Sequence, residues 1–218
     1  MALTVREESG ATRSDGVYEE LRQRIVRGVL RPNQRLIEAE LADQLQVSRT
    51  PVREGLQRLA ADGLILSRRR GWVVREHTPE EITEIYEIRA ALEGYAAGLA
   101  ATRATEAEIA AIVALHRREA AGLVQSPRDH LVEVNDAFHE AIIEATKNRR
   151  LAEQIRRNRE FHFSYRIAAL YSDEEAAASV RGHDELVGAL EARDCAAAED
   201  AARRHVTEAL TAILGKVR

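Results

Sequence analysis

Four side chains in the C-terminal half of the chain have the types and spacing of a metal site. Asn135 and His139 are four residues apart, so on a helix they share one face. The midpoint between His183 and His205 falls on the predicted turn Arg193–Asp194. If the flanking helices are antiparallel, each of these histidines lies about 16 Å from that turn, at one level. Three imidazoles and one oxygen suit a divalent ion such as zinc, nickel or manganese.

The alternative for these histidines is a set of unrelated packing or surface roles. The remaining histidines lack partners at such spacing, and we interpret His77, His116, His130 and His162 as surface or packing residues. Metal catalysis would also need a general base, for which Glu140 and Glu144 are the nearest candidates. Neither is well placed, since Glu140 points about 100° away from His139 on a helix. We therefore predict no enzyme, with a small metal-dependent hydrolase or lyase as the alternative.

A second group of residues has the pattern of a DNA-reading helix. Ser48 is a suitable N-cap and Pro51 suits a first helical turn, which predicts a helix from about Arg49 to Ala61. Its packing side carries Val52, Leu56 and Leu59, and its free side carries Thr50, Arg53 and Gln57. The planar fork of arginine can donate two hydrogen bonds to a guanine edge or to a phosphate. A solvated face of an ordinary amphipathic helix is the alternative.

The flanking segments predict a winged helix-turn-helix around that helix. A short amphipathic helix is expected at Glu38–Leu45, before the turn at residues 46–48. Two strands are expected at Leu64–Leu66 and Trp72–Val74, with the basic turn Ser67–Gly71 between them. The candidate DNA contacts are Arg35, Ser48, Arg49, Thr50, Arg53, Arg68, Arg69, Arg70 and Gly71. Of these, Arg49 and Arg53 are expected to reach base edges. The wing residues, Arg68 to Gly71, are expected to touch the DNA backbone or the minor groove.

The stretch SRTPVREGLQRLAADGLI followed by RRRGWVV resembles the DNA-binding domain of the GntR family of bacterial transcription regulators. Members of this family often carry an arginine early in the second helix, where this chain has Ala39. The resemblance implies double-stranded DNA as a partner, read by a homodimer at an inverted repeat.

Composition and caps predict a mainly α protein with two domains. The 218 residues are 45% hydrophobic and 31% charged, which is typical of a globular chain. We expect a flexible tail at 1–13, a winged helix-turn-helix at 14–76 and an all-α bundle at 78–218. The first helix is predicted at Ser14–Gly28, with Val17, Leu21, Ile25 and Val29 on one stripe, and residues 30–36 as a turn. Helix starts or breaks at Thr78, Thr105, Ser126, Asn148, Ser172 and Arg193 divide the bundle into about six helices.

Charge separates the two halves of the chain. Residues 1–75 carry 14 Arg and no Lys against 10 acidic residues, a net charge of +4, whereas the remainder carries −8. The basic half is the half with the predicted helix-turn-helix. No long apolar segment or signal peptide is visible, so a cytoplasmic protein without a membrane partner is expected. The one cysteine, Cys195, is expected to be a buried, inert thiol.

The C-terminal half resembles the FCD ligand-binding domain of the FadR-type subgroup of GntR regulators. The resemblance rests on EIYEIRAALEGYAAGLAA, NDAFHEAII and HDELVGALEARDCAAAEDAARRHV. Metal-binding members place an Asp or Asn four residues before a His and add two later His, which here are Asn135, His139, His183 and His205. An inward arginine of that domain matches Arg89, which would pair with an effector carboxylate. An ion pair with Glu93 is the alternative for Arg89.

Together these features predict a transcription regulator whose operator affinity is modulated by a small carboxylate metabolite bound at the metal site. Effector binding would act through a difference in affinity for two states of the protein. The third possibility is an interaction protein whose helix-turn-helix arginines are idle.

Overall fold

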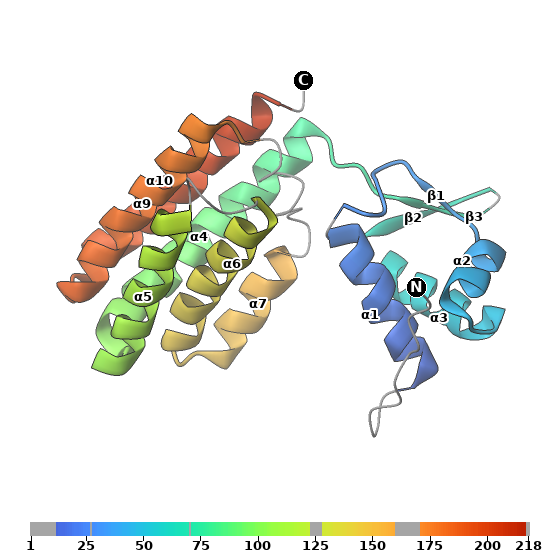
Figure 1. Ribbon diagram of the computed structural model, residues 1–218, viewed down its shortest axis with the longest axis horizontal. Coiled ribbons are helices and arrows are strands. Elements are labelled where there is room, and N and C mark those ends of the chain that lie inside the picture. Colours follow the sequence, from blue (N-terminus) through green and yellow to red (C-terminus); the bar gives the residue numbers. More distant parts are fainter. Residues whose placement is uncertain (1–11, 27, 70, 123–127, 160–170, 217–218) are drawn as a thin grey trace. The chain divides into compact units, whose positions relative to one another are not determined.

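The computed structural model describes residues 12–26, 28–69, 71–122, 128–159 and 171–216, without the side chains of 128–132. The chain divides into two compact units, Met1–Glu76 and His77–Arg218, which are considered separately (Figure 1). The mainly α fold class is confirmed, since helices dominate both units and the described strands form one small sheet.

The described residues of the first unit form three helices and a three-stranded sheet. Its helices are α1 (Arg13–Val26), α2 (Glu38–Leu45) and α3 (Arg49–Ala61), and its strands are β1 (Arg35–Leu36), β2 (Ile65–Arg68) and β3 (Gly71–Val74). The sheet order is β1-β3-β2, and both pairs are antiparallel. The helix-turn-helix bounds agree with the sequence pattern, because the α3 side chains Val52, Leu56 and Leu59 are fully buried.

Close packing of α1 against α3 depends on one small residue. A Cβ atom at Gly55 would lie 3.1 Å from Val17 Cγ1 and 3.2 Å from the backbone nitrogen of Tyr18. The Tyr18 hydroxyl also donates a 2.8 Å hydrogen bond to Asp62, just after α3. Helix α1 is therefore held against the buried side of α3.

Several expectations for this unit were wrong in detail. Residues 35–36 form a strand rather than part of a turn, because β3 offers them an antiparallel partner. Val29 lies beyond the end of α1 and is 64% exposed, and Leu30 is buried instead. Ser48 holds the N-cap position of α3, but its side chain makes no capping hydrogen bond. The tail expected over 1–13 lies mostly outside the described residues, and its last residue, Arg13, already begins α1.

The second unit is a bundle of helices. The described residues form α4 (Pro79–Arg103), α5 (Glu106–Gly122), α6 (Arg128–Ala145), α7 (Arg149–Arg159), α9 (Asp173–Glu191) and α10 (Cys195–Leu214). Complete capping boxes begin α4 at Thr78 and α9 at Ser172, as the sequence predicted. The expected restart at Ser126 lies outside the described residues.

Helix α4 is the central element of the bundle. It contacts α6, α7, α9 and α10, with α9 and α10 on one side of it and α6 and α7 on the other (Figure 1). Glycines permit the close approach of α10, since a Cβ atom at Gly94 would lie 2.6 Å from Arg203 Cγ, and one at Gly98 would lie 3.1 Å from Cys195 Sγ. Cys195 is nevertheless exposed at the start of α10, so the expectation of a buried thiol was wrong.

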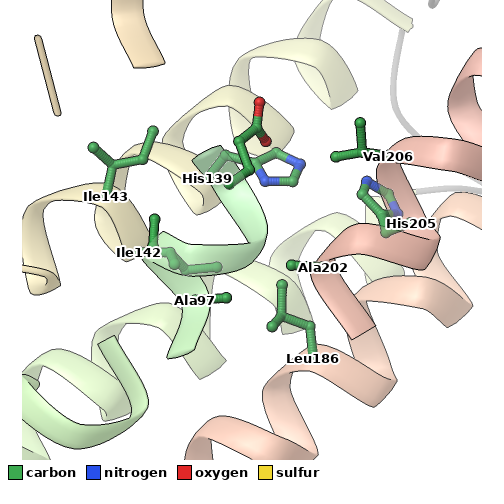
Figure 2. A pocket seen from close by; sticks show the side chains of 10 residues that line it. Ala97, His139, Ile142, Ile143, Leu186, Ala202, His205 and Val206 are labelled. Carbon is green, nitrogen blue, oxygen red and sulfur yellow. The ribbon is translucent and has the colours of Figure 1, made fainter. Parts of the chain in front are cut away.

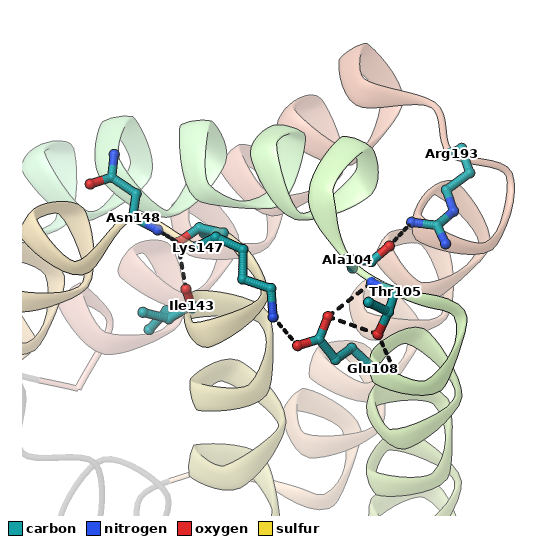
Figure 3. Close-up of polar contacts among 8 residues, drawn as sticks. Ala104, Thr105, Glu108, Ile143, Lys147, Asn148 and Arg193 are labelled. Carbon is teal, nitrogen blue, oxygen red and sulfur yellow. Dashed lines mark hydrogen bonds and ion pairs between the residues drawn. The ribbon is translucent and has the colours of Figure 1, made fainter.

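Cationic side chains join the helix ends at one end of the bundle (Figure 3). Arg193, in the turn between α9 and α10, donates to the carbonyl of Ala104 after α4. Lys147, in the turn between α6 and α7, pairs with Glu108 of α5, whose carboxylate also accepts from Thr105. The Arg193 contact satisfies a carbonyl that the end of α4 leaves unpaired, and the Lys147 contact joins the turn after α6 to α5.

None of the helices in the described part of the chain is long and apolar enough to cross a membrane.

Candidate DNA-reading surface and candidate metal centre

Helix α3 presents its candidate DNA contacts to solvent. Arg49, Thr50 and Arg53 are exposed, while the opposite side of the helix is buried in the first unit. The exposed side lies at the N-terminal half of the helix, where a recognition helix touches base edges. Ser48, with no capping bond to make, is likewise exposed at the start of this surface.

Arg53 does not lie free on this surface but is held by Glu38 of α2. Its Nη2 and Nε atoms donate to Glu38 Oε2 at 2.9 and 3.1 Å. The hydrogen bond from Arg53 is the main reason why the pKa of Glu38 is lowered, and a side-chain hydrogen bond from Trp72 in the wing adds to it. Glu38 thus connects the recognition helix with the wing, a link that sequence spacing did not suggest.

The wing carries a basic hollow of about 650 Å³. Its lining includes Arg35, Arg68, Arg69 and Gly71, all of them candidate DNA contacts. Gly71 has a φ of 128°, a left-handed conformation that side chains disfavour, so glycine allows the sharp start of β3. Arg35 joins this group because β1 pairs with β3. Arg70 lies outside the described residues.

The second unit brings three histidines together from three helices. His139 of α6, His183 of α9 and His205 of α10 each place a ring nitrogen within 4.8 Å of the other two. The Nε2 atoms of His183 and His205 are 3.1 Å apart. Two nitrogens bound to one ion at about 2.0–2.1 Å would lie roughly 3 Å apart, so this spacing fits ligands that share a metal.

A small cavity adjoins the histidine cluster (Figure 2). Its volume is about 20 Å³, room for roughly one water molecule or ion. Figure 2 shows His139 and His205 on opposite sides of it, with Ala97, Ala202 and Leu186 among its apolar walls. The three histidines fit a single divalent ion, and the cavity lies beside two of them, since His139 and His205 line it and His183 does not.

Burial keeps the imidazoles neutral. Burial is the main cause that lowers the pKa of His183 to about 3, and it holds the pKa values of His139 and His205 well below their usual value. Neutral imidazole is the form that binds a metal, so no proton has to be displaced from a histidinium near neutral pH.

Sequence reasoning missed two members of this cluster, His116 and Glu119 on α5. Glu119 Oε2 is 2.8 Å from His183 Nδ1, and His116 Nε2 is 2.6 Å from Asp184 Oδ1. Both His116 and Glu119 are buried, and burial raises the pKa of Glu119 to about 7. The available signal was their spacing of three residues, which places an imidazole and a carboxylate on one face of α5. His130 and His162 cannot be compared in this way, because their side chains lie outside the described residues.

Asn135 lies one turn before His139 on α6 and is half-buried. It hydrogen bonds to the neighbouring carboxyl of Asp136, whose pKa is raised chiefly by burial. Its role as an oxygen ligand stays a prediction.

Arg89 is buried and pairs with Glu93, the alternative considered from sequence. Its Nε atom donates to Glu93 Oε1 at 2.9 Å, while Arg159 of α7 donates to Glu93 Oε2 at 3.0 Å. Burial alone would raise the pKa of Glu93, but the charges of Arg159 and Arg89 hold it well below its usual value. Glu93 also lines the small cavity beside the histidines. Nη1 of Arg89 is buried and has no hydrogen-bond partner among the described residues.

Glu140 and Glu144, the candidate general bases named from the sequence, pair with an arginine on another helix. Arg156 of α7 pairs with both Glu140 and Glu144, its Nε atom donating to Glu140 Oε1 at 2.9 Å. Neither carboxylate lines the small cavity. Neither residue is therefore placed to act as the general base that the hydrolase or lyase alternative assigned to it.

Comparison with known proteins agrees with both halves of the molecule. The protein-family model described as "Bacterial regulatory proteins, gntR family" matches residues 13–74, and the family model of the FCD domain matches residues 84–208. The HTH-type transcriptional regulator YdhC of Bacillus subtilis is 27% identical over 87% of this chain and 84% of its own length. A regulator from the TAR-I region of Agrobacterium vitis is 35% identical over 62% of this chain and 81% of its own length.

The fold is also similar to solved structures. Escherichia coli McbR/YncC superposes with a TM-score of 0.77 at 25% identity, covering 94% of this chain and 98% of that one.

Proposed function

Because the chain belongs to the GntR family of bacterial regulatory proteins and carries an FCD domain, we propose that a small carboxylate bound at a metal site controls its affinity for an operator. The chain is a transcription regulator rather than an enzyme, as its relatives are. We further propose that it belongs to the FadR subgroup, and that it binds both a metal ion and an effector.

The single observation that carries the metal site is the meeting of His139, His183 and His205 within 4.8 Å. Asn135 would supply an oxygen ligand from the turn before His139. Zinc, nickel or manganese would fit these donors, and the ion would offer a Lewis-acidic position to a carboxylate oxygen. The protein's own side chains would bind the rest of the effector and orient it.

The charge around the cluster favours an anionic effector. Arg89 and Arg159 share the single carboxylate of Glu93, which leaves one positive charge uncompensated within this group. Asp136 is the other acidic neighbour, and burial raises its pKa, which weakens it as a counter-charge. The unpartnered Nη1 of Arg89 offers a donor for the effector carboxylate.

The DNA half would act as part of a homodimer on an inverted repeat. In each subunit α3 would enter the major groove, with Arg49 and Arg53 at base edges and Thr50 at a phosphate or a base. Ser48 would lie at the start of this contact, and the wing would touch the backbone or the minor groove. Helix α4 supplies a candidate dimer surface, since Ile88 and Tyr95 are each 51% exposed and lie two turns apart on one face. A closed symmetric pair would bury these side chains.

Thermal unfolding across a panel of small carboxylates, with and without prior chelation, tests the effector proposal. A ligand at 100 times its dissociation constant should stabilise the protein by about 2.7 kcal/mol, which raises the melting temperature measurably. We expect one class of acid to do so only in the metal-loaded protein, and Arg89→Lys to weaken the response.

The same panel can contradict the proposal. Elemental analysis showing no metal in protein purified without chelators, together with melting temperatures that neither chelation nor any acid changes, would leave the histidines with packing roles.

A further inference from the structure

We propose that Glu119 is a positioning residue for the metal site, holding His183 in the tautomer whose Nε2 lone pair faces His139 and His205. This inference rests on the proposed metal site. It assigns a function to a buried carboxylate that the three-histidine pattern in the sequence does not include.

His183 is engaged at both ring nitrogens. Nδ1 lies 2.8 Å from Glu119 Oε2, and Nε2 lies 3.1 Å from His205 Nε2. His183 is completely buried and Glu119 is 5% exposed, so water does not compete for these contacts. The ring of Phe138, 4.5 Å away between centroids, packs on the imidazole and restricts its rotation.

The hydrogen bond decides which nitrogen of His183 can bind an ion. Neutral imidazole carries one proton, and a carboxylate accepts hydrogen bonds but does not donate them. In its ionised form, Glu119 only accepts at Nδ1 and so favours the Nδ1–H tautomer, which leaves the lone pair on Nε2, directed at the other two histidines. In the opposite tautomer Nε2 carries the proton, and the nitrogen in the cluster is not available to a metal.

His116, the other histidine near Glu119, is hydrogen bonded to a different carboxylate. Its Nε2 atom is 2.6 Å from Oδ1 of Asp184, whose side chain is 65% exposed. A carboxylate in solvent accepts a hydrogen bond here, so His116 carries its proton on Nε2. The Nδ1 atom of His116 is 4.0 Å from Glu119 Oε2, beyond hydrogen-bond distance, so it donates nothing to Glu119. The carboxylate remains available to accept from His183.

The test compares Glu119→Ala and Glu119→Gln with wild type in full-length protein. Affinity for zinc is measured by competition with a chelator, and long-range ¹H–¹⁵N spectra of the metal-free protein report the His183 tautomer. Loss of a partner that orients a histidine ligand typically costs about 10–100-fold in metal affinity. We expect that loss in Glu119→Ala, partial recovery in Glu119→Gln because its amide oxygen still accepts from Nδ1–H, and the Nδ1–H tautomer in wild type.

Two controls separate this inference from the proposed function. Glu106→Ala changes a glutamate on the same helix whose side chain is 91% exposed, and zinc affinity should not change. His205→Ala must weaken zinc binding; if wild type binds no zinc, or His205→Ala binds it equally well, the metal site itself fails.

Three results would overturn the role of Glu119 alone: wild-type zinc affinity in Glu119→Ala, an Nε2–H tautomer of His183 in the wild type, or a second zinc ion per chain that is lost with Glu119. The last would make Glu119 a ligand, since His116, Glu119 and His183 also lie within 4.8 Å of one another.

Discussion

At the scale of single residues, three of the candidate site residues are in contact with buried or half-buried acids. Arg53 is held by Glu38, Arg89 by Glu93, and His183 by Glu119. Each contact restricts a long or rotatable side chain before any ligand arrives, which lowers the conformational entropy lost on binding.

Arg53→Ala should remove the base preference at one operator position. A bidentate contact from arginine to guanine contributes roughly 1–3 kcal/mol of discrimination. Selection from a random DNA library measures this loss position by position. Arg58→Ala is the matched control, because Arg58 lies on the same helix but stacks on Tyr18 and pairs with Asp15. An unchanged selected sequence with Arg53→Ala would exclude a base-reading role.

Glu93→Gln should destabilise the metal-free protein at pH 7 by about 3–5 kcal/mol, since buried Arg89 and half-buried Arg159 lose their charged partner. The pKa of Glu93 is held well below its usual 4.5, so its stabilisation is fully present above that pH and is lost as the pH falls through the lower, folded-state value. The wild type should lose more free energy of unfolding than the variant between pH 5 and pH 3. Urea unfolding measures both, with Glu87→Gln, an exposed change on the same helix, as the control.

At the scale of elements, glycines determine how closely the helices around the site approach. Gly94 and Gly98 let α10 lie against α4. Gly182 of α9 does the same beside the histidines, because a Cβ atom there would lie 2.9 Å from His205 Nδ1. The position of the His205 ring therefore depends on the absence of a side chain one residue before His183.

Gly182→Ala should displace His205 and weaken zinc binding at least about tenfold, although no donor atom is removed. Gly188→Ala is the control on the same helix, since its new Cβ atom would meet nothing within 4 Å. That control should bind zinc normally and gain about 0.5–1 kcal/mol of stability from the better helix propensity of alanine. Equal zinc affinity in the two variants would show that His205 has room to move.

At the scale of the whole molecule, the candidate DNA-reading surface and the proposed effector site lie in different compact units. His205→Ala should spare the DNA sequence selected without effector and abolish the response to the carboxylate. This variant keeps the contact between His183 and Glu119, so little else in the cluster is disturbed. Loss of DNA binding with the metal content intact would contradict this division, and selection experiments with elemental analysis distinguish the two outcomes.

The sequence by itself determined most of the elements and the family. Helix bounds follow from local signals, such as the capping box at Thr78 and the apolar spacing of α3, which act within a few residues. Even the pairing of His183 with His205 could be predicted, because two antiparallel helices joined by a short turn fix which residues lie level.

Only the tertiary structure decided what lies opposite these elements. The partner of β1, the acids that hold Arg53 and His183, and the second arginine on Glu93 all come from segments distant in sequence. The exposure of Cys195 and Val29 was likewise set by packing rather than by residue type. Periodicity shows which face of a helix is buried, but it does not show which helix covers that face. The partners of the charged side chains depend on which helix that is, so only the tertiary structure reveals them.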